Sequence, residues 1–372
     1  MNTEKKKMKR NIQHPLFGIS PKNWIEVLDR NGGVDKAFLD RAAFITLGSV
    51  FTVPARMLFK IMYQSKINKF QIKNPPVIII GHWRSGTTYL HELLCEDPQF
   101  SYVTLWHTML PDSFPLLDPA KEFLANFLPK TRPMDNIEVD INGPYEEEAG
   151  IAILSPWSFF HGIHFPKNAE EQYVKSIHYT GLSSREMAEW KDMYFNFMKT
   201  VMYMQPEKIL LLKDPANTAR IPLLLDLFPD AKFIHIYRNP YKVYLSTIKM
   251  RNKVLEKMAL QKCEPDEIEK QVIENYKRLM NAFFEQKSLI PKENFVEIRY
   301  EDLVKNPLKQ VEYIYNSLKL PNFKKAVPHM KKYLERKKDY KVNVYKIDKK
   351  IIDHVKEEWN FTLDLWKYEP PN

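Results

Sequence analysis

The strongest constraint on the fold of this 372-residue chain is a short apolar run that leads into a glycine-containing turn. Residues 75–80 read PPVIII, and their β-branched side chains predict a short strand that is buried in a parallel sheet. Residues 81–94, GHWRSGTTYLHELL, follow directly and combine Gly-x-x-x-x-Gly spacing (Gly81, Gly86) with apolar residues at helical spacing. Because a strand-to-helix turn presents backbone N–H groups to an anion, this segment predicts a phosphate-binding loop.

The strand-then-helix pattern occurs three more times along the chain. Apolar runs that precede helical patterns stand at residues 208–213 (KILLLK), 232–237 (KFIHIY) and 294–300 (NFVEIRY). Repeated units of this kind predict an α/β fold, a P-loop-like parallel sheet flanked by helices on both faces. Ligands of such sheets bind at the carboxyl ends of the strands.

Two other regions differ from these units. Residues 1–70 have a basic start and helical patterns, which predict a basic N-terminal helical extension to a domain at 71–372. Residues 100–205 are rich in Pro and aromatic residues and predict a helical insertion over the ligand-binding end of the sheet, on the side where a second substrate, the acceptor, would bind. We expect no signal peptide, because no apolar segment follows the basic start. The apolar run at 42–53 ends at Pro54, short of the roughly 18 residues of a spanning helix, so we expect no transmembrane anchor.

Charge and cysteine content narrow the possible functions. Lys and Arg (56) outnumber Asp and Glu (46), which gives a formal net charge of +10 and suits an anionic ligand. The lysines are scattered, so we interpret most of them as solvated surface and expect no nucleic-acid partner. The two cysteines, Cys95 and Cys263, lack metal-ligand spacing and fit a reducing compartment. We expect a cytoplasmic protein, with peripheral membrane contact through the N-terminal helices as a further hypothesis, and an open oligomeric state.

The loop lacks the lysine that ATP and GTP enzymes carry before the Ser/Thr. Thr87 stands in its place, and Arg84 is the nearest cation. Arg238 directly follows the 232–237 strand, at a position where an ATP or GTP enzyme could carry an Asp that holds magnesium. The sequence therefore favours a nucleotide that is bound without metal, with Arg84 beside its bridging oxygen. A nucleotide kinase-like P-loop enzyme is the alternative, which explains the loop but not these departures.

An ordered set of segments resembles the sulfotransferase family. GHWRSGTTYL (81–90) resembles the 5′-phosphosulfate loop of the family, YRNPYKVYLS (237–246) its 3′-phosphate segment, and RYEDLVKNP (299–307) a later strand end. Residues 210–240 follow the variant found in the bacterial branch of the family. The resemblance covers about residues 75–345. It implies transfer of a sulfuryl group from 3′-phosphoadenosine 5′-phosphosulfate to a hydroxyl acceptor, without a metal.

This donor carries phosphate at both ends of its ribose, so it needs two anion subsites. Arg238 and Ser246 match the residues that bind the 3′ phosphate in the family, and a strand-end guanidinium and a helical hydroxyl can converge on one phosphate. Two tyrosines are candidates for contact with the adenine. The predicted nucleotide-binding residues are Arg84, Ser85, Gly86, Thr87, Thr88, Tyr89, Arg238, Ser246 and Tyr300.

Sulfuryl transfer also needs a cation at the leaving phosphate and a base for the proton of the acceptor. We expect Arg84 and Lys213 to be the cations, since Lys213 matches a lysine that the family uses near the sulfuryl group. His107 stands where bacterial relatives often carry a Glu, and a neutral imidazole suits a base at neutral pH.

Other candidates for the base remain open. The acidic run Glu146, Glu147 and Glu148 matches an acidic stretch of bacterial relatives and ranks second, because acids in a first helical turn ordinarily serve the helix dipole. His82, within the loop, ranks third.

The aromatic insertion and the amphipathic N-terminus favour an apolar alcohol, a sterol or a lipid as acceptor over a sugar. A non-enzymatic protein that binds anions at a membrane surface is the alternative from another functional class.

Overall fold

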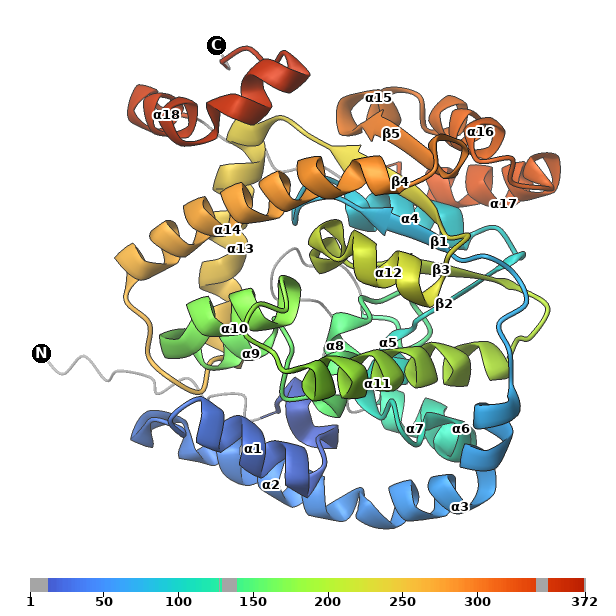
Figure 1. Cartoon of the computed structure of the whole chain (residues 1–372), viewed down its shortest axis with the longest axis vertical. Coiled ribbons are helices and arrows are strands. Elements are labelled where there is room, and N and C mark those ends of the chain that lie inside the picture. Colours follow the sequence, from blue (N-terminus) through green and yellow to red (C-terminus); the bar gives the residue numbers. More distant parts are fainter. Residues whose placement is uncertain (1–12, 127, 129–138, 339–346, 371–372) are drawn as a thin grey trace, which may run out of the picture.

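Five parallel strands form the sheet, in the order β2-β3-β1-β4-β5. The structure is a computed structural model that describes residues 13–126, 128, 139–338 and 347–370 (Figure 1). The predicted α/β sheet flanked by helices is confirmed. The strands are β1 (Val77–Ile80), β2 (Phe100–Tyr102), β3 (Ile209–Lys213), β4 (Lys232–Tyr237) and β5 (Phe295–Arg299).

One strand lies where the sequence predicted only the insertion. Strand β2 pairs with Ile209–Leu211 of β3 and forms one edge of the sheet. A strand of three residues is too short to show a period-two pattern, so it could not be predicted from the sequence. The sheet therefore extends to residue 102, and the insertion follows it.

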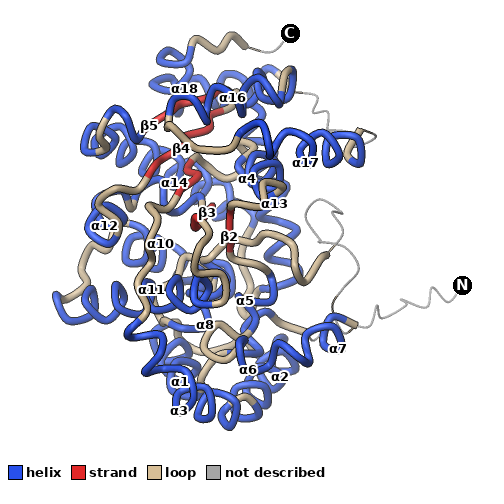
Figure 2. The backbone as a smooth tube through the Cα atoms, turned by 90° about the vertical axis from the view of Figure 1, so that its right-hand side faces the viewer, coloured by secondary structure: helices blue, strands red, loops and turns tan. Residues whose placement is uncertain are grey.

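The apolar run of β1 is explained by burial on both faces. Val77 and Ile79 contribute to one core cluster, whereas Ile78 and Ile80 contribute to the other, because successive side chains of a strand point to opposite faces. The first face is covered by α4 (Thr87–Cys95), α15 (Tyr300–Lys305), α16 (Pro307–Ser317) and α17 (Phe323–Arg336). The second face is covered by α12 (Ile221–Leu227), α13 (Pro240–Met258), α14 (Pro265–Gln286) and α18 (Lys349–Trp366). Figure 2 shows the strands surrounded by helices.

The insertion is largely helical in the part that the structure describes. Many of its aromatic side chains, Trp106 and Trp190 among them, are buried in the larger core cluster, so they pack the core. The helices are α5 (Leu105–Met109), α6 (Phe114–Leu117), α7 (Lys121–Ala125), α8 (Glu148–Leu154), α9 (His161–His164), α10 (Ala169–Ile177) and α11 (Ser184–Tyr203).

Three N-terminal helices lie at the end of the molecule opposite the C-terminal helices (Figure 1). Trp24 and Ile45 from these helices share a small core with Ala152, Phe165 and Leu260. The described part of the N-terminal extension is therefore packed against the rest of the chain. The helices are α1 (Pro21–Arg30), α2 (Leu39–Phe51) and α3 (Val53–Lys69).

Candidate functional site

The loop between β1 and α4 has a conformation that requires glycine at two positions. Gly81 and Gly86 have φ angles of +144° and +103°, and Arg84 between them has +69°. A Cβ on Gly86 would lie 2.2 Å from Cδ2 of Tyr300, and one on Gly81 would lie 2.3 Å from the carbonyl oxygen of Ile236. The loop is thus pressed against the chain at the carboxyl ends of β4 and β5, where ligands of parallel sheets bind.

Four of the residues predicted for nucleotide binding contact one another at this place. Arg84 Nε donates a hydrogen bond of 2.9 Å to the hydroxyl of Ser246, and Arg238 Nη1 donates one of 3.1 Å to the carbonyl oxygen of Arg84. The guanidinium carbon of Arg238 lies 4.3 Å from the ring centroid of Tyr300, within cation–π range. The loop, the end of β4, helix α13 and the start of α15 therefore converge on one point.

Two buried donors at this point have no hydrogen-bond partner among the described residues. They are Nε of Arg238 and the hydroxyl of Ser85. Buried polar groups are normally paired, and an unpaired one costs free energy. A bound anion would supply acceptors for both, so the donor set fits a phosphate-bearing ligand.

The start of α4 carries the remaining predicted loop residues. Thr87, the first residue of the helix, is buried, and Thr88 and Tyr89 are partly exposed. Burial raises the pKa of Tyr89, and Tyr300 raises it further, which places the two tyrosines near each other.

Lys213 ends β3 next to the loop. The β1–β3 register pairs it with Ile79, two residues before Gly81. Its Nζ lies 2.6 Å from Oε1 of Glu146, and the lysine is almost fully buried, whereas 22% of the glutamate side chain is exposed. The predicted cation and one member of the acidic run thus form an ion pair at this edge of the sheet.

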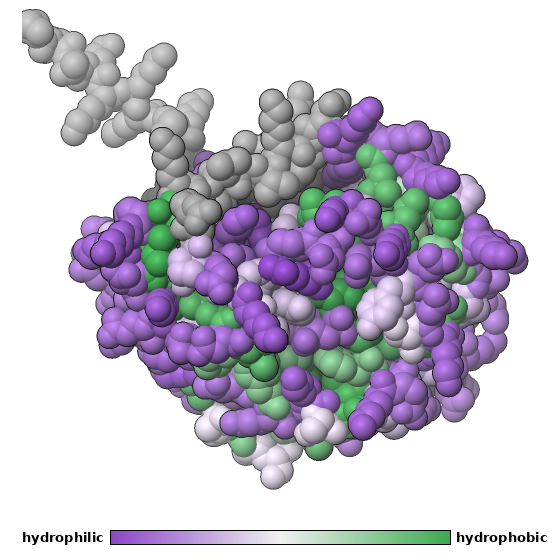
Figure 3. All heavy atoms as spheres, turned by 90° about the horizontal axis from the view of Figure 1, so that it is seen from above, coloured by the Kyte–Doolittle hydropathy of each residue, from purple (hydrophilic) through white to green (hydrophobic). Residues whose placement is uncertain are grey.

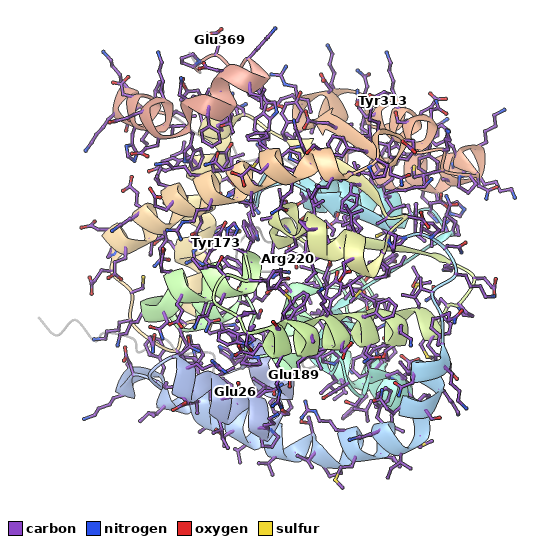
Figure 4. All side chains as sticks on the ribbon, in the orientation of Figure 1. Glu26, Tyr173, Glu189, Arg220, Tyr313 and Glu369 are labelled. Carbon is purple, nitrogen blue, oxygen red and sulfur yellow. The ribbon has the colours of Figure 1, made fainter. Side chains whose placement is uncertain are left out.

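The second and third acids of the run have structural partners. Glu148 accepts hydrogen bonds from the hydroxyl of Ser158 and the backbone N–H of Phe159, both at 2.7 Å. It also pairs at 2.8 Å with Arg220, and both side chains are fully buried. Figure 4 labels Arg220 among the side chains in the middle of the view. A fully paired buried carboxylate of this kind holds the start of α8 in place.

Glu147 is also buried and belongs to the same network. It accepts hydrogen bonds from Asn217 at 2.7 Å and Tyr194 at 3.3 Å, and burial raises its pKa. Nearby, Asp214 accepts a hydrogen bond from the backbone N–H of Glu148, and burial together with the three glutamates holds its pKa well above the ordinary value. Of the three glutamates, Glu146 is the one that pairs with Lys213 and is partly exposed to solvent.

The two candidate histidines are held in structural contacts. Nδ1 of His107 accepts from the backbone N–H of Thr104, the N-cap of α5, and its ring lies 4.4 Å from that of Phe114. Burial lowers the pKa of His107 to about 3, and that of His82 to about 4. His82 bonds the carbonyl oxygen of Trp83 through Nδ1 at 2.7 Å. Both rings are therefore neutral at neutral pH, but their affinity for a proton is low.

Sequence reasoning missed the contribution of the C-terminus. The ring of Trp366 stacks on Tyr237, the last residue of β4, with a centroid distance of 4.7 Å. The hydroxyl of Tyr368 donates to Glu301 at 2.7 Å and accepts from Arg299 at 3.0 Å. The aromatic cluster of LWKY near the chain end was the available signal, but nothing in the sequence connected it to β4 and β5.

A small cavity opens at the carboxyl end of β4, beside the contact of Arg238 with Arg84. Its lining comes from the loop, from β4 and its following turn, and from helices α13, α14 and α18. The lining residues are His82, Ser85, His235, Ile236, Tyr237, Arg238, Val243, Tyr276, Met280 and Trp366. Within the described ranges, no group of three or more His, Cys, Asp or Glu side chains could hold a metal ion.

Comparison with known proteins gives one family. The sequence model of the Sulfotransferase family matches residues 75–325. The chain is 33% identical over 360 residues to the omega-hydroxy-beta-dihydromenaquinone-9 sulfotransferase Stf3 of Mycobacterium bovis and to that of Mycobacterium tuberculosis. Each alignment covers 95% of this chain and 92% of the relative.

Two solved structures share the fold. Sulfotransferase STF9 from Mycobacterium avium superposes with a TM-score of 0.68 at 16% identity, over 95% of this chain and 97% of that one. Sulfotransferase STF1 from Mycobacterium tuberculosis H37Rv gives 0.67 at 19% identity, over 92% and 93%.

The buried histidines predict acid sensitivity. The pKa of His107 falls from 6.5 to about 3 on folding, so the unfolded chain binds the extra proton between these pH values and the folded chain does not. The contribution of neutral His107 to stability is therefore complete above pH 6.5 and is lost as the pH falls toward the folded pKa. Urea unfolding at neutral pH and near pH 5 should show a falling free energy of unfolding. The fall should be smaller in His107→Gln, by about 1 kcal/mol per pH unit. Equal pH slopes for the two proteins would contradict this reading of His107.

Proposed function

The chain belongs to the sulfotransferase family, and we propose that it transfers a sulfuryl group from 3′-phosphoadenosine 5′-phosphosulfate to the hydroxyl of an apolar, lipid-like acceptor. The acceptor class is supported by Stf3, whose name gives a hydroxylated menaquinone as its acceptor. The proposed location of the protein is the cytoplasm or the surface of a membrane, with peripheral membrane contact through the N-terminal helices.

The observation that carries the donor assignment is the contact of Arg84, Arg238 and Ser246 beside the loop. A nucleotide with phosphate at the 5′ and 3′ positions needs two neighbouring anion subsites. The loop N–H groups, Ser85 and the threonines of α4 serve the 5′ end. Arg238, whose Nε is an open buried donor, and Ser246 serve the 3′ phosphate. Tyr89 and Tyr300 contact the adenine.

The reaction moves the sulfuryl group in line between two oxygens. The hydroxyl oxygen of the acceptor forms the new bond to sulfur while the bond from sulfur to the bridging oxygen of the donor breaks. The electron pair of that bond goes to the leaving phosphate, and Arg84 and Lys213 neutralise the charge that develops there. The proton of the acceptor goes to a base.

The geometry favours Glu146 as that base. Its carboxylate is partly exposed and lies 2.6 Å from the Lys213 ammonium. The base and a cation for the leaving group therefore lie together at the carboxyl end of β3. His107, which its position in the sequence favoured, uses Nδ1 to cap its own helix, and burial lowers its pKa to about 3. His107 and, after it, His82 are the alternative bases.

The acceptor class is tested with labelled donor and a panel of acceptors. We expect label on long-chain primary alcohols, sterols or prenylated quinols in detergent and little on sugars, because the insertion is apolar and aromatic. Transfer should persist in the presence of a chelator. Labelling of sugars alone, or a strict need for magnesium at saturating donor, would contradict the proposal.

The 3′-phosphate subsite predicts a selective loss in Arg238→Ala. Calorimetry should show weaker binding of 3′,5′-adenosine bisphosphate by about 1.5–3 kcal/mol, because a charge-assisted hydrogen bond is lost. Binding of adenosine 5′-phosphosulfate, which has no 3′ phosphate, should change far less. Lys242→Ala removes an exposed positive charge on the first turn of α13 and is the matched control. Equal losses for both ligands would show that Arg238 does not recognise the 3′ phosphate.

The base is tested with Glu146→Gln and His107→Gln at saturating donor. If Glu146 accepts the proton, Glu146→Gln should lower kcat for an alkyl alcohol by the roughly 10²–10⁴ of a lost general base. The loss should be much smaller for 4-nitrophenol, which ionises readily and needs little help from a base. Donor affinity should be nearly unchanged, and the acid limb of the pH–rate profile should disappear.

The same assay separates the alternatives. His107→Gln should stay active with the pH profile of the wild type. A large loss of kcat in His107→Gln, together with an active Glu146→Gln enzyme, would assign the proton to His107. Equal losses for both acceptors in Glu146→Gln would mean that Glu146 only positions Lys213.

A further inference from the structure

Helices α2 and α3 follow each other almost without interruption along one edge of the molecule (Figure 1). Residues Lys36–Lys69 form one helical stretch of 34 residues that is long and apolar enough to cross a membrane by length and composition. At 1.5 Å per residue it is about 50 Å long. Of its most apolar part only 28% is buried.

One side of this stretch is attached to the protein. Ile45, Phe59 and Ile67 are buried. The guanidinium of Arg41 is buried and donates to two backbone carbonyls near the end of α13, and Arg56 forms an ion pair with Asp112. If the stretch crossed a bilayer, these contacts would break and the guanidinium of Arg41 would lose its partners in an apolar medium. The stretch is therefore attached lengthwise to the surface of the protein and does not span a bilayer in this fold.

The opposite side is apolar and exposed. At 3.6 residues per turn, the positions of the exposed residues fall on one side of the helical stretch, and the stripe runs through both helices. It comprises Leu39 (56% exposed), Leu47 (72%), Val50 (61%), Phe51 (80%), Met57 (63%), Leu58 (46%), Ile61 (79%) and Met62 (46%). A row of large, exposed apolar side chains on one side of a helical stretch is typical of an interaction surface. By contrast, the described part of the face over the C-terminal helices is mainly hydrophilic (Figure 3).

The charges around the stripe are almost all positive. Lys36, Lys60, Lys66 and Lys69 are exposed, and Asp40 is the one acid between residues 36 and 69. Long lysine side chains can extend to the phosphate level of a bilayer while their stems lie on apolar surface. A second copy of the chain would bring the same positive rim against itself, whereas an anionic lipid surface complements it.

We propose that the outer face of α2 and α3 lies in the plane of an anionic lipid bilayer, with its apolar stripe among the acyl chains. The choice of a bilayer rests in part on the proposed lipid acceptor. The position of the stripe supports this choice, because α3 packs on α6 of the insertion, α6 packs on α5, and α5 packs on α8, which begins two residues after Glu146. The membrane face and the acceptor side of the site therefore belong to one packed unit.

The test is cosedimentation of the full chain with vesicles of phosphatidylcholine and phosphatidylglycerol, and with vesicles of phosphatidylcholine alone. The wild type should bind, and it should bind the anionic vesicles more strongly. The double variant Phe51→Glu/Ile61→Glu should lose at least about tenfold in partition constant, because two apolar side chains no longer enter the acyl region. The matched control Leu289→Glu/Leu365→Glu adds the same two charges at exposed apolar positions elsewhere and should bind like the wild type.

Failure of the wild type to bind, or equal binding by the two double variants, would overturn the proposal. A dimer in solution that Phe51→Glu/Ile61→Glu converts to a monomer, without vesicle binding by the wild type, would overturn it in favour of a second copy. Sulfation of a water-soluble phenol is measured in parallel and should be the same in all variants. Its absence in the wild type would contradict the proposed function and leave the vesicle result standing.

Discussion

The close contact between Gly86 and the ring of Tyr300 is the constraint on which the arrangement of the site depends. No side chain fits between them, since a Cβ would lie 2.2 Å from the ring. The guanidinium carbon of Arg238 lies 4.3 Å from the centroid of the same ring, and Arg238 donates a hydrogen bond to the carbonyl oxygen of Arg84. The loop is therefore in direct contact with the residue that follows β5 and the residue that follows β4. These contacts set the spacing of the two proposed anion subsites, whose residues lie more than 150 positions apart in sequence.

The acidic run shows how buried electrostatics places one exposed carboxylate. Glu148 and Arg220 form a pair without solvent contact, and leaving either one alone would bury an unpaired charge at a cost of about 3–5 kcal/mol. Glu147 is held by Asn217 and Tyr194. With Glu147 and Glu148 fixed inward, Glu146 has a defined direction, and it meets Lys213 at the end of β3. The network thus acts on the candidate base through the backbone that the three residues share.

Much of this organisation could be predicted from the sequence, and the exceptions have physical causes. Runs such as VIII and KFIHIY predict strands because a buried parallel strand needs apolar residues on both faces. The contact of Arg84 with Ser246 agrees with the predicted proximity of the two segments. The three adjacent glutamates could not be separated, because their partners Arg220, Asn217 and Lys213 come from distant segments. Strand β2 was too short to leave a pattern, and the position of Trp366 over β4 depends on tertiary packing. The Thr104–His107 cap, in contrast, had a local signal in its spacing.

A lipid acceptor places a demand on the molecule that the small cavity beside Arg238 does not meet by itself. Removing an acyl or isoprenoid chain from a bilayer costs roughly 0.8 kcal/mol for each CH₂ group, so a water-dissolved enzyme would need a long apolar pocket to offset the transfer. An enzyme that lies on the bilayer needs to bind only the hydroxyl end, while the tail stays among the lipids. The described residues have their exposed apolar side chains concentrated along α2 and α3. Helix α3 packs on α6 and α11 of the insertion, and α6 is linked through α5 to α8, which begins two residues after Glu146, the partner of Lys213. On this view, the apolar surface that serves the acceptor lies mainly outside the catalytic cavity, and the cavity has only to bring a hydroxyl to the donor.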